Sequence, residues 1–183
     1  MEVYHGSPPE TAGRSERELR AYALLDRLGI AFIRTDHPDR PAVTMEVCAE
    51  VDTVLGVHIC KNLFLCNRQQ TDFYLLLMPG GKPFKTKELS RQLGVSRLSF
   101  ANETHMERLL DLHPGSVSVL GLMNDAERRV RLVIDEDVLK EEYFGCHPCE
   151  NTGSIRFLTK ELTDKLLPAL GREPVLVKLV GAE

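Results

Sequence analysis

A lysine within an otherwise strand-like segment is the feature that most constrains this chain. Residues 57–66 (VHICKNLFLC) are rich in branched and aromatic side chains and lack Gly and Pro, which predicts a β-strand. Because side chains alternate between the two faces of a strand, Lys61 shares a face with Ile59 and Leu63, opposite Asn62. An ammonium among aliphatic side chains is costly unless it reaches water, a partner or a cleft. Lys61 is therefore either a strand-end lysine that extends to solvent or a functional residue.

Composition narrows the class of protein. The chain has 183 residues, enough for one domain with a sizeable core. Its net charge of −4 argues against a protein that coats nucleic acid without selectivity. No run approaches the ~18 apolar residues of a membrane span, and the N-terminus lacks the basic start and apolar core of a secretory signal. Five cysteines, an odd number, fit a reducing cytoplasmic compartment better than a disulfide framework.

The order of expected elements indicates the fold class. Residues 1–14 are predicted to form a loose arm and residues 15–183 a single domain. Ser15 with Glu18, and Thr104 with Glu107, have the spacing of capping boxes at helix starts. Further helices are expected after Thr44, Thr86, Asp135 and Thr159, and strands at 30–34, 57–66, 72–78, 117–122, 130–134, 143–146, 154–158 and 175–180. This irregular order predicts an α/β fold of the mixed α+β kind, because a doubly wound parallel sheet requires regular alternation.

The cysteines permit a redox or a zinc interpretation, and neither is favoured. Residues 146–149 (CHPC) form a CxxC motif, but a redox dithiol opens a helix after an early strand, whereas this one runs into the turn at 151–153. His58 and Cys60 have poor spacing for a tetrahedral zinc site with Cys146 and Cys149. We therefore expect small buried thiols, no metal and no cofactor. The sequence also lacks a G-x-S-x-G nucleophile motif and a phosphate-binding P-loop.

Three other segments carry candidate chemistry. Residues 82–97 contain five basic residues and one acid, so Lys82, Lys85, Lys87 and Arg91 form either a phosphate-binding face or a solvated helix face. Backbone amides at 115–118 (GSVS) are either aimed at an anion or carbonyl oxygen, or part of an ordinary helix stop. The pair at 147–148 (HP) is, taken alone, typical of a turn.

Taken in order, these motifs resemble one known family. The resemblance rests on KNLFL at 61–65, GVSRLSF at 94–100, PGSVS at 114–118, ND at 124–125 with RRV at 128–130, and HP at 147–148 followed by NT at 151–152. Each motif is weak alone, but the ordered set spans about Ser15 to Val180. The chain resembles the YbaK-like aminoacyl-tRNA deacylases, free-standing relatives of the editing domain of bacterial prolyl-tRNA synthetases, and the branch that clears alanine from proline tRNA in particular.

The resemblance implies a fold and a reaction. The fold is a twisted, largely closed mixed sheet surrounded by helices, and the reaction is hydrolysis of the ester that joins a wrong amino acid to the tRNA 3′ end. The implied partner is the acceptor end of mischarged tRNA, and the sequence does not determine whether the protein acts alone or docked to prolyl-tRNA synthetase. Lys61, Gly115, Ser116 and His147 match the catalytic motifs, while Asn62, Ile59, Leu63, Val117 and Ser118 are expected around the substrate. The family often has Pro after the Ser of this turn, where this chain has Val119, which affects loop rigidity and substrate preference.

The alternatives differ in substrate or in class. A pocket too small for proline would accept alanine and spare the correct product, because one methylene changes binding by only ~1–3 kcal/mol. The same chemistry would serve a cysteinyl- or seryl-tRNA deacylase. A non-catalytic tRNA-binding or regulatory module is the alternative of a different class. The amino acid removed and the oligomeric state are not determined by the sequence.

Overall fold

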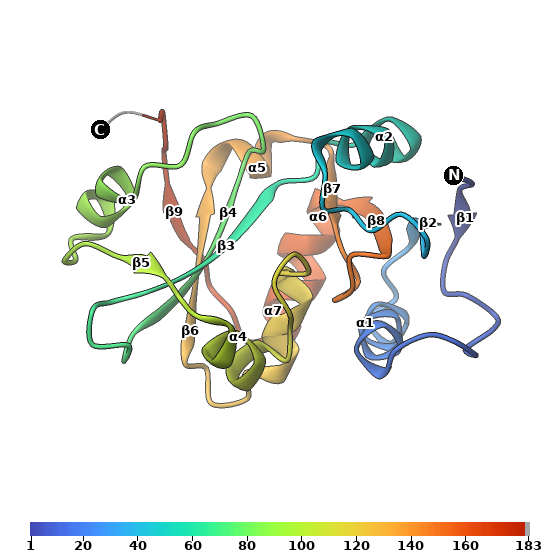
Figure 1. The fold of residues 1–183 in the computed structure, drawn as a ribbon, viewed down its shortest axis with the longest axis horizontal. Coiled ribbons are helices and arrows are strands. Elements are labelled where there is room, and N and C mark those ends of the chain that lie inside the picture. The colour runs from blue at the N-terminus through green and yellow to red at the C-terminus, as the bar shows by residue number, and fades with distance from the viewer. Residues whose placement is uncertain (182–183) are drawn as a thin grey trace.

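The computed structural model describes residues 1–181, and its strands form two sheets (Figure 1). The strands are β1 (Tyr4–His5), β2 (Phe32–Asp36), β3 (Lys61–Cys66), β4 (Phe73–Met78), β5 (Ser99–Phe100), β6 (Val130–Asp135), β7 (Tyr143–Cys146), β8 (Gly153–Leu158) and β9 (Val175–Val177). The smaller sheet is antiparallel with the order β1-β2-β8-β7. The larger sheet has the order β5-β3-β4-β6-β9, with antiparallel pairs on β3 and parallel pairs on β6.

Helices cover the outer faces and ends of both sheets. They are α1 (Glu16–Arg27), α2 (Met45–Leu55), α3 (Thr86–Leu93), α4 (Glu103–Leu110), the 3-10 helix η1 (Val119–Asn124), α5 (Glu136–Lys140), α6 (Thr159–Glu161), the π-helical η2 (Leu162–Leu166) and α7 (Leu167–Ala169). Figure 1 shows α2 above and α1 below the smaller sheet, and α3 on the side of the larger sheet that faces away from the smaller one. The predicted mixed α/β class is confirmed, but the strands divide between two sheets instead of forming one largely closed sheet.

β4 is the central strand of the larger sheet, and its burial is consistent with that position. All six of its side chains are buried, as expected for a strand with a hydrogen-bonded neighbour on each side and an apolar layer on each face. The main core lies between the two sheets and includes Phe64, Leu75 and Phe157. A second cluster under α3 contains Leu65 and Tyr74. A third cluster packs α2 against β2.

That third cluster positions the loop before β3. It contains Val51, Leu55 and Val57, with Ile59 packed against them. The predicted strand at 57–66 is correct only from Lys61, because residues 57–60 leave the larger sheet and cross over β7. A Cβ placed on Gly145 of β7 would lie 2.8 Å from Ile59 Cγ1 and 2.9 Å from Val57 Cγ1. Glycine at this position therefore makes the crossing possible.

Of the two predicted capping boxes, one is correct and one is wrong. Ser15 caps α1 as predicted, with its hydroxyl accepting from the Glu18 amide at 3.2 Å. The predicted cap at Thr104 is wrong, because Asn102 caps α4 by accepting from the His105 amide at 2.9 Å. The predicted strand at 117–122 is also wrong, since η1 occupies most of this segment.

The first residues are more ordered than a loose arm. β1 pairs with β2, placing Tyr4 opposite Arg34, and the Arg14 guanidinium bridges the carboxylates of Glu18 and Asp36. These contacts hold the arm predicted over 1–14 against the smaller sheet. At the other end, residues 182–183 of the predicted domain lie outside the described residues.

Candidate active site

A cavity of about 400 Å³ lies where α2, the crossing segment and the start of β3 meet. It brings together Ile59, Lys61 and His147, three of the residues predicted from sequence, although His147 is distant from the other two along the chain. The walls also include main chain and side chains that the sequence did not single out, namely Ala42, Val43, Thr44, Met45, Cys48, Val51, Asp52, Cys60 and Gly80. The cavity is therefore mostly apolar with a few polar groups, as is typical of small-molecule sites.

Lys61 enters this cavity from the first position of β3. Its ammonium donates a hydrogen bond to the main-chain carbonyl of Lys82, in the loop after β4. An ammonium has three N–H donors, and within the described part of the chain no other group takes the remaining two. The strand-end position explains how a lysine is tolerated beside aliphatic side chains, and two donors are left for a bound molecule.

His147 is held by a chain of hydrogen bonds that determines its protonation. Its Nδ1 lies 3.0 Å from the Gly153 carbonyl and 3.2 Å from Ser154 Oγ. Ser154 Oγ is also 3.0 Å from Nε2 of His37, whose Nδ1 lies 3.0 Å from the Arg40 carbonyl. Because a carbonyl only accepts, each histidine carries its proton on Nδ1, and the Ser154 hydroxyl donates to His37 Nε2.

Burial favours the neutral form of both histidines. It lowers the pKa of His147 more than the hydrogen bond to the Gly153 carbonyl raises it. Burial likewise lowers the pKa of His37. The remaining nitrogen of His147, Nε2, has no hydrogen-bond partner among the described residues and is not sealed from solvent. His147 lines the cavity, and an unprotonated Nε2 without a partner has the form that a general base requires.

Gly115 lies directly behind the cavity wall. Its φ of +85° is in the left-handed region, and an added Cβ would lie 3.2 Å from Asn151 Nδ2 and 3.8 Å from Val43 Cγ1. The glycine loop is thus placed against the outer side of the wall residue Val43. Ser116 and Ser118 are buried and do not line the cavity. The Ser116 amide donates to the His113 carbonyl, so it is not aimed at a substrate.

The other predicted substrate-binding residues lie outside the cavity. The Asn62 amide donates to the Cys60 carbonyl at 3.1 Å, and its Oδ1 is buried without a partner among the described residues. Leu63 packs against the cluster under α3. Val117 packs against the main core, and the Ser118 hydroxyl caps η1 by accepting from the Leu120 amide at 3.2 Å. Leu63 shares its strand face with Lys61, but it lies two residues further along β3, where the cluster under α3 covers that face.

The predicted basic face divides into two groups. Lys82 is bound internally: its ammonium lies 2.9 Å from the Asp135 carboxylate, 2.8 Å from the Asp137 carboxylate and 2.6 Å from the Leu179 carbonyl. Burial alone would lower the pKa of Lys82, but its hydrogen bonds to the two carboxylates leave it raised. The remaining predicted cations, Lys85, Lys87 and Arg91, line a separate shallow hollow with Arg97 along α3.

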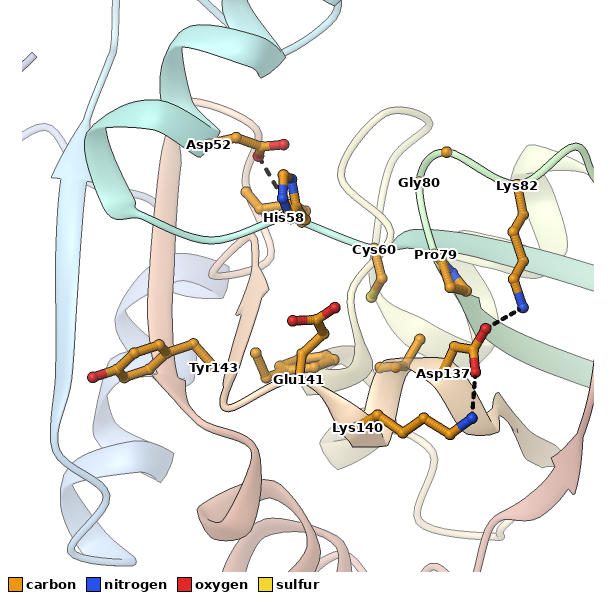
Figure 2. Close-up of a pocket in the computed structure, with 14 residues that line it drawn as sticks. Asp52, His58, Cys60, Pro79, Gly80, Lys82, Asp137, Lys140, Glu141 and Tyr143 are labelled. Atoms are coloured by element: carbon orange, nitrogen blue, oxygen red, sulfur yellow. Dashed lines mark hydrogen bonds and ion pairs between the residues drawn. The ribbon is translucent and has the colours of Figure 1, made fainter.

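A different hollow, of about 490 Å³, adjoins the cavity that Lys61 lines (Figure 2). The two share Asp52, Ile59, Cys60 and Gly80 as a partition. Figure 2 shows Lys82 and Lys140 both reaching Asp137 on α5, which forms the floor of this hollow. On the α5 side of this hollow, the charged side chains of Lys82, Asp137 and Lys140 therefore form ion pairs with one another.

The thiols lack the properties of nucleophiles. The five cysteines are free, and burial raises the pKa of Cys60 and of Cys149 to about 12. Burial also raises the pKa of Cys146. Redox dithiols and nucleophilic cysteines have lowered pKa values, so Cys146 and Cys149 behave as the buried thiols expected from sequence. Within residues 1–181, no group of three or more His, Cys, Asp or Glu side chains has the arrangement of a metal site.

Comparison with known proteins agrees with this geometry. The family model of the aminoacyl-tRNA editing domain matches residues 39–165, which contain every residue of the cavity. The chain belongs to the aminoacyl-tRNA editing domain family. The resemblance to YbaK-like deacylases is therefore confirmed, and the members of this family are hydrolases that remove amino acids from tRNA.

Relatives cover most of the chain. The prolyl-tRNA editing protein ProX of Acetoanaerobium sticklandii is 30% identical over 149 residues, which are 81% of this chain and 89% of that protein. The prolyl-tRNA synthetase associated domain-containing protein 1 of Mus musculus is 30% identical over 87% of this chain and 96% of its own length. A solved structure described as a candidate trans-editing enzyme for prolyl-tRNA synthetase has a TM-score of 0.68 at 18% identity, covering 92% of this chain and 99% of that one.

No helix in the described residues is long and apolar enough to span a bilayer.

Proposed function

We propose that this protein hydrolyses the ester between alanine and the 3′ end of proline tRNA, acting in trans on tRNA that a synthetase has mischarged. The observation that carries the proposal is the cavity in which Lys61, with two unused N–H donors, and His147, with an accessible Nε2, both face a small apolar space. The name of the Acetoanaerobium sticklandii relative, a prolyl-tRNA editing protein, supports the tRNA and the class of reaction.

The chemistry follows from these two groups. Water attacks the ester carbonyl carbon, and His147 Nε2 accepts the proton that water loses. The negative charge that develops on the carbonyl oxygen is stabilised by the Lys61 ammonium. The bond between the carbonyl carbon and the ribose oxygen then breaks, that oxygen takes the proton back from His147 Nε2, and the free amino acid leaves. No step uses a cysteine, in agreement with the raised thiol pKa values.

The size of the amino acid is limited by apolar walls. Ala42, Val43, Val51 and Ile59 border the space beside Lys61. These walls favour a methyl side chain over the pyrrolidine ring of proline, so correctly charged prolyl-tRNA is spared. Discrimination of alanine from serine or cysteine is weaker in an apolar pocket, because a similar side chain bearing one polar atom is rejected by only about 10²-fold.

The test is release of labelled amino acid from alanyl-, cysteinyl-, seryl- and prolyl-tRNA of the proline type. We expect alanine to be released fastest and proline to be retained. Lys61→Ala should lose about 10²–10³-fold in kcat/KM, the typical effect of removing one oxyanion donor. Lys160→Ala removes an exposed lysine on α6, outside the cavity, and should leave the rate unchanged.

Each alternative has its own result. Preferential loss of cysteine or serine would assign the protein to another branch of the family. Binding of tRNA without turnover on any of the four esters would leave a non-catalytic tRNA-binding module. Docking on prolyl-tRNA synthetase belongs to the same proposal, and co-sedimentation of the two proteins with and without tRNA tests it.

A further inference from the structure

Asp52 is the one carboxylate among the described residues that line the Lys61 cavity. It lies on α2, one turn after Cys48, and borders both this cavity and the adjoining hollow. In Figure 2 its carboxylate points away from the helix towards the crossing segment that carries His58 and Cys60. Asp52 therefore lies on the partition between the two hollows.

The carboxylate is held in place but not neutralised. Its Oδ1 accepts one hydrogen bond, from the Ile59 amide at 3.3 Å, and it forms no ion pair within the described residues. The Lys61 ammonium in the same cavity is bound to the Lys82 carbonyl instead. Burial raises the pKa of Asp52, and the Ile59 amide and His58 oppose that shift. Burying a carboxylate costs free energy unless a cation or further hydrogen-bond donors bind its remaining lone pairs.

The proposed substrate supplies such a cation. An aminoacyl ester carries an α-ammonium two bonds from the carbonyl carbon, so a site that binds the carbonyl with Lys61 must also accommodate a positive charge nearby. We infer that Asp52 binds the α-ammonium of the aminoacyl group and orients the ester between Lys61 and His147, an inference that rests on the proposed function. Asp52 is then a specificity-determining residue that the sequence motifs did not single out.

The inference predicts discrimination between two esters of nearly equal size. Alanyl-tRNA and lactyl-tRNA differ only in that a hydroxyl replaces the ammonium. Wild type should prefer the alanyl ester by about 10- to 100-fold in kcat/KM, the range expected for a charge-assisted hydrogen bond. Asp52→Asn keeps the Oδ1 acceptor for the Ile59 amide but removes the charge. It should lower the alanyl rate, retain the lactyl rate and reduce the preference to about threefold or less.

A matched control separates local charge from net charge. Glu141 lines the adjoining hollow but not the Lys61 cavity, so Glu141→Gln makes the same charge change behind the partition. This variant should keep the wild-type preference. Equal losses on both esters in Asp52→Asn would overturn the inference, because a structural role or contacts with ribose hydroxyls would produce that result.

A binding measurement distinguishes failure of the inference from failure of the proposed function. Titration calorimetry with 3′-alanylamino-3′-deoxyadenosine, a non-hydrolysable mimic of the tRNA end, and with its lactyl counterpart needs no turnover. Ammonium-dependent binding that Asp52→Asn abolishes would support the inference even if no ester is cleaved. Ester cleavage with equal affinity for both mimics would overturn the inference and leave the proposed function intact.

Discussion

Lys82 is predicted to stabilise the fold and not to bind tRNA. Its side chain is 23% exposed, whereas that of its partner Asp135 is 1% exposed. Lys82→Met keeps the aliphatic stem but leaves the Asp135 carboxylate buried without its cation. Removing one partner of a buried pair costs about 3–5 kcal/mol, and the partial exposure of Lys82 places the expected loss near 3 kcal/mol. For a chain of this size that corresponds to a fall in Tm of about 6–12 °C.

The assay is urea unfolding of wild type and variants, followed by circular dichroism. Lys87→Met is the matched control, because Lys87 is exposed on α3, and a surface substitution should change the unfolding free energy by less than about 0.5 kcal/mol. Adding Asp135→Asn to Lys82→Met should recover part of the loss, since Asn keeps the acceptor for the Asp137 amide without the charge. An unfolding free energy for Lys82→Met equal to that of Lys87→Met would refute the reasoning.

Three further predictions concern pH, the glycine loop and the basic face. Because the pKa values of His37 and His147 are lowered from 6.5 by folding, the unfolded chain binds more protons just below that pH. Their contribution to stability is therefore complete above about pH 6.5 and is lost as the pH falls towards the folded-state values. Tm measured between about pH 5 and 8 should show this fall, and His37→Asn should reduce it; a flat profile would contradict the assignment. Gly115→Ala should cost about 1–2 kcal/mol from the left-handed backbone alone and should also slow deacylation. Gly13→Ala, at a similar φ with no atom within 4 Å of the added Cβ, should cost stability without slowing it, so equal rates in both variants would show that the loop does not shape the site. Lys87→Glu should weaken tRNA binding and lower the salt dependence of Kd by about one unit of slope, and an unchanged slope in filter binding would remove α3 from the tRNA interface.

The sequence singled out Lys61 and His147, two polar residues that line the cavity, but few of the residues that form its walls. Lys61 was recognisable because a charged side chain interrupts an apolar strand pattern, and that pattern depends only on local alternation. His147 was recognisable through its motif, but its tautomer depends on His37 and Ser154, which are distant in sequence. The carboxylate of Asp52 carried no local signal, because an acidic residue on an amphipathic helix is usually solvent-exposed. Its place in the cavity arises only when residues 57–60 cross over β7.

Lys82 shows the opposite limitation. A run of basic residues in an acidic protein indicates a phosphate-binding face, and charge counting treats its members alike. The structure distinguishes them because β6 and α5 bring two carboxylates to Lys82 and none of those residues is near it in sequence. The fold class therefore followed from local patterns, whereas the role of each cation depended on tertiary neighbours.

Because Gly145 lies so close to residues 57–60, a substitution at position 145 would change the shape of the Lys61 cavity through Ile59. One side of the Ile59 side chain borders the cavity. A Cβ at position 145 would lie against the other side of the same side chain. A methyl group at 145 would push the Ile59 side chain forward and narrow the space for the amino acid, unless a smaller residue at 59 compensates. Residues 59 and 145 should therefore vary together among related proteins that edit different amino acids. Such a change would alter substrate preference while leaving Lys61 and His147 untouched.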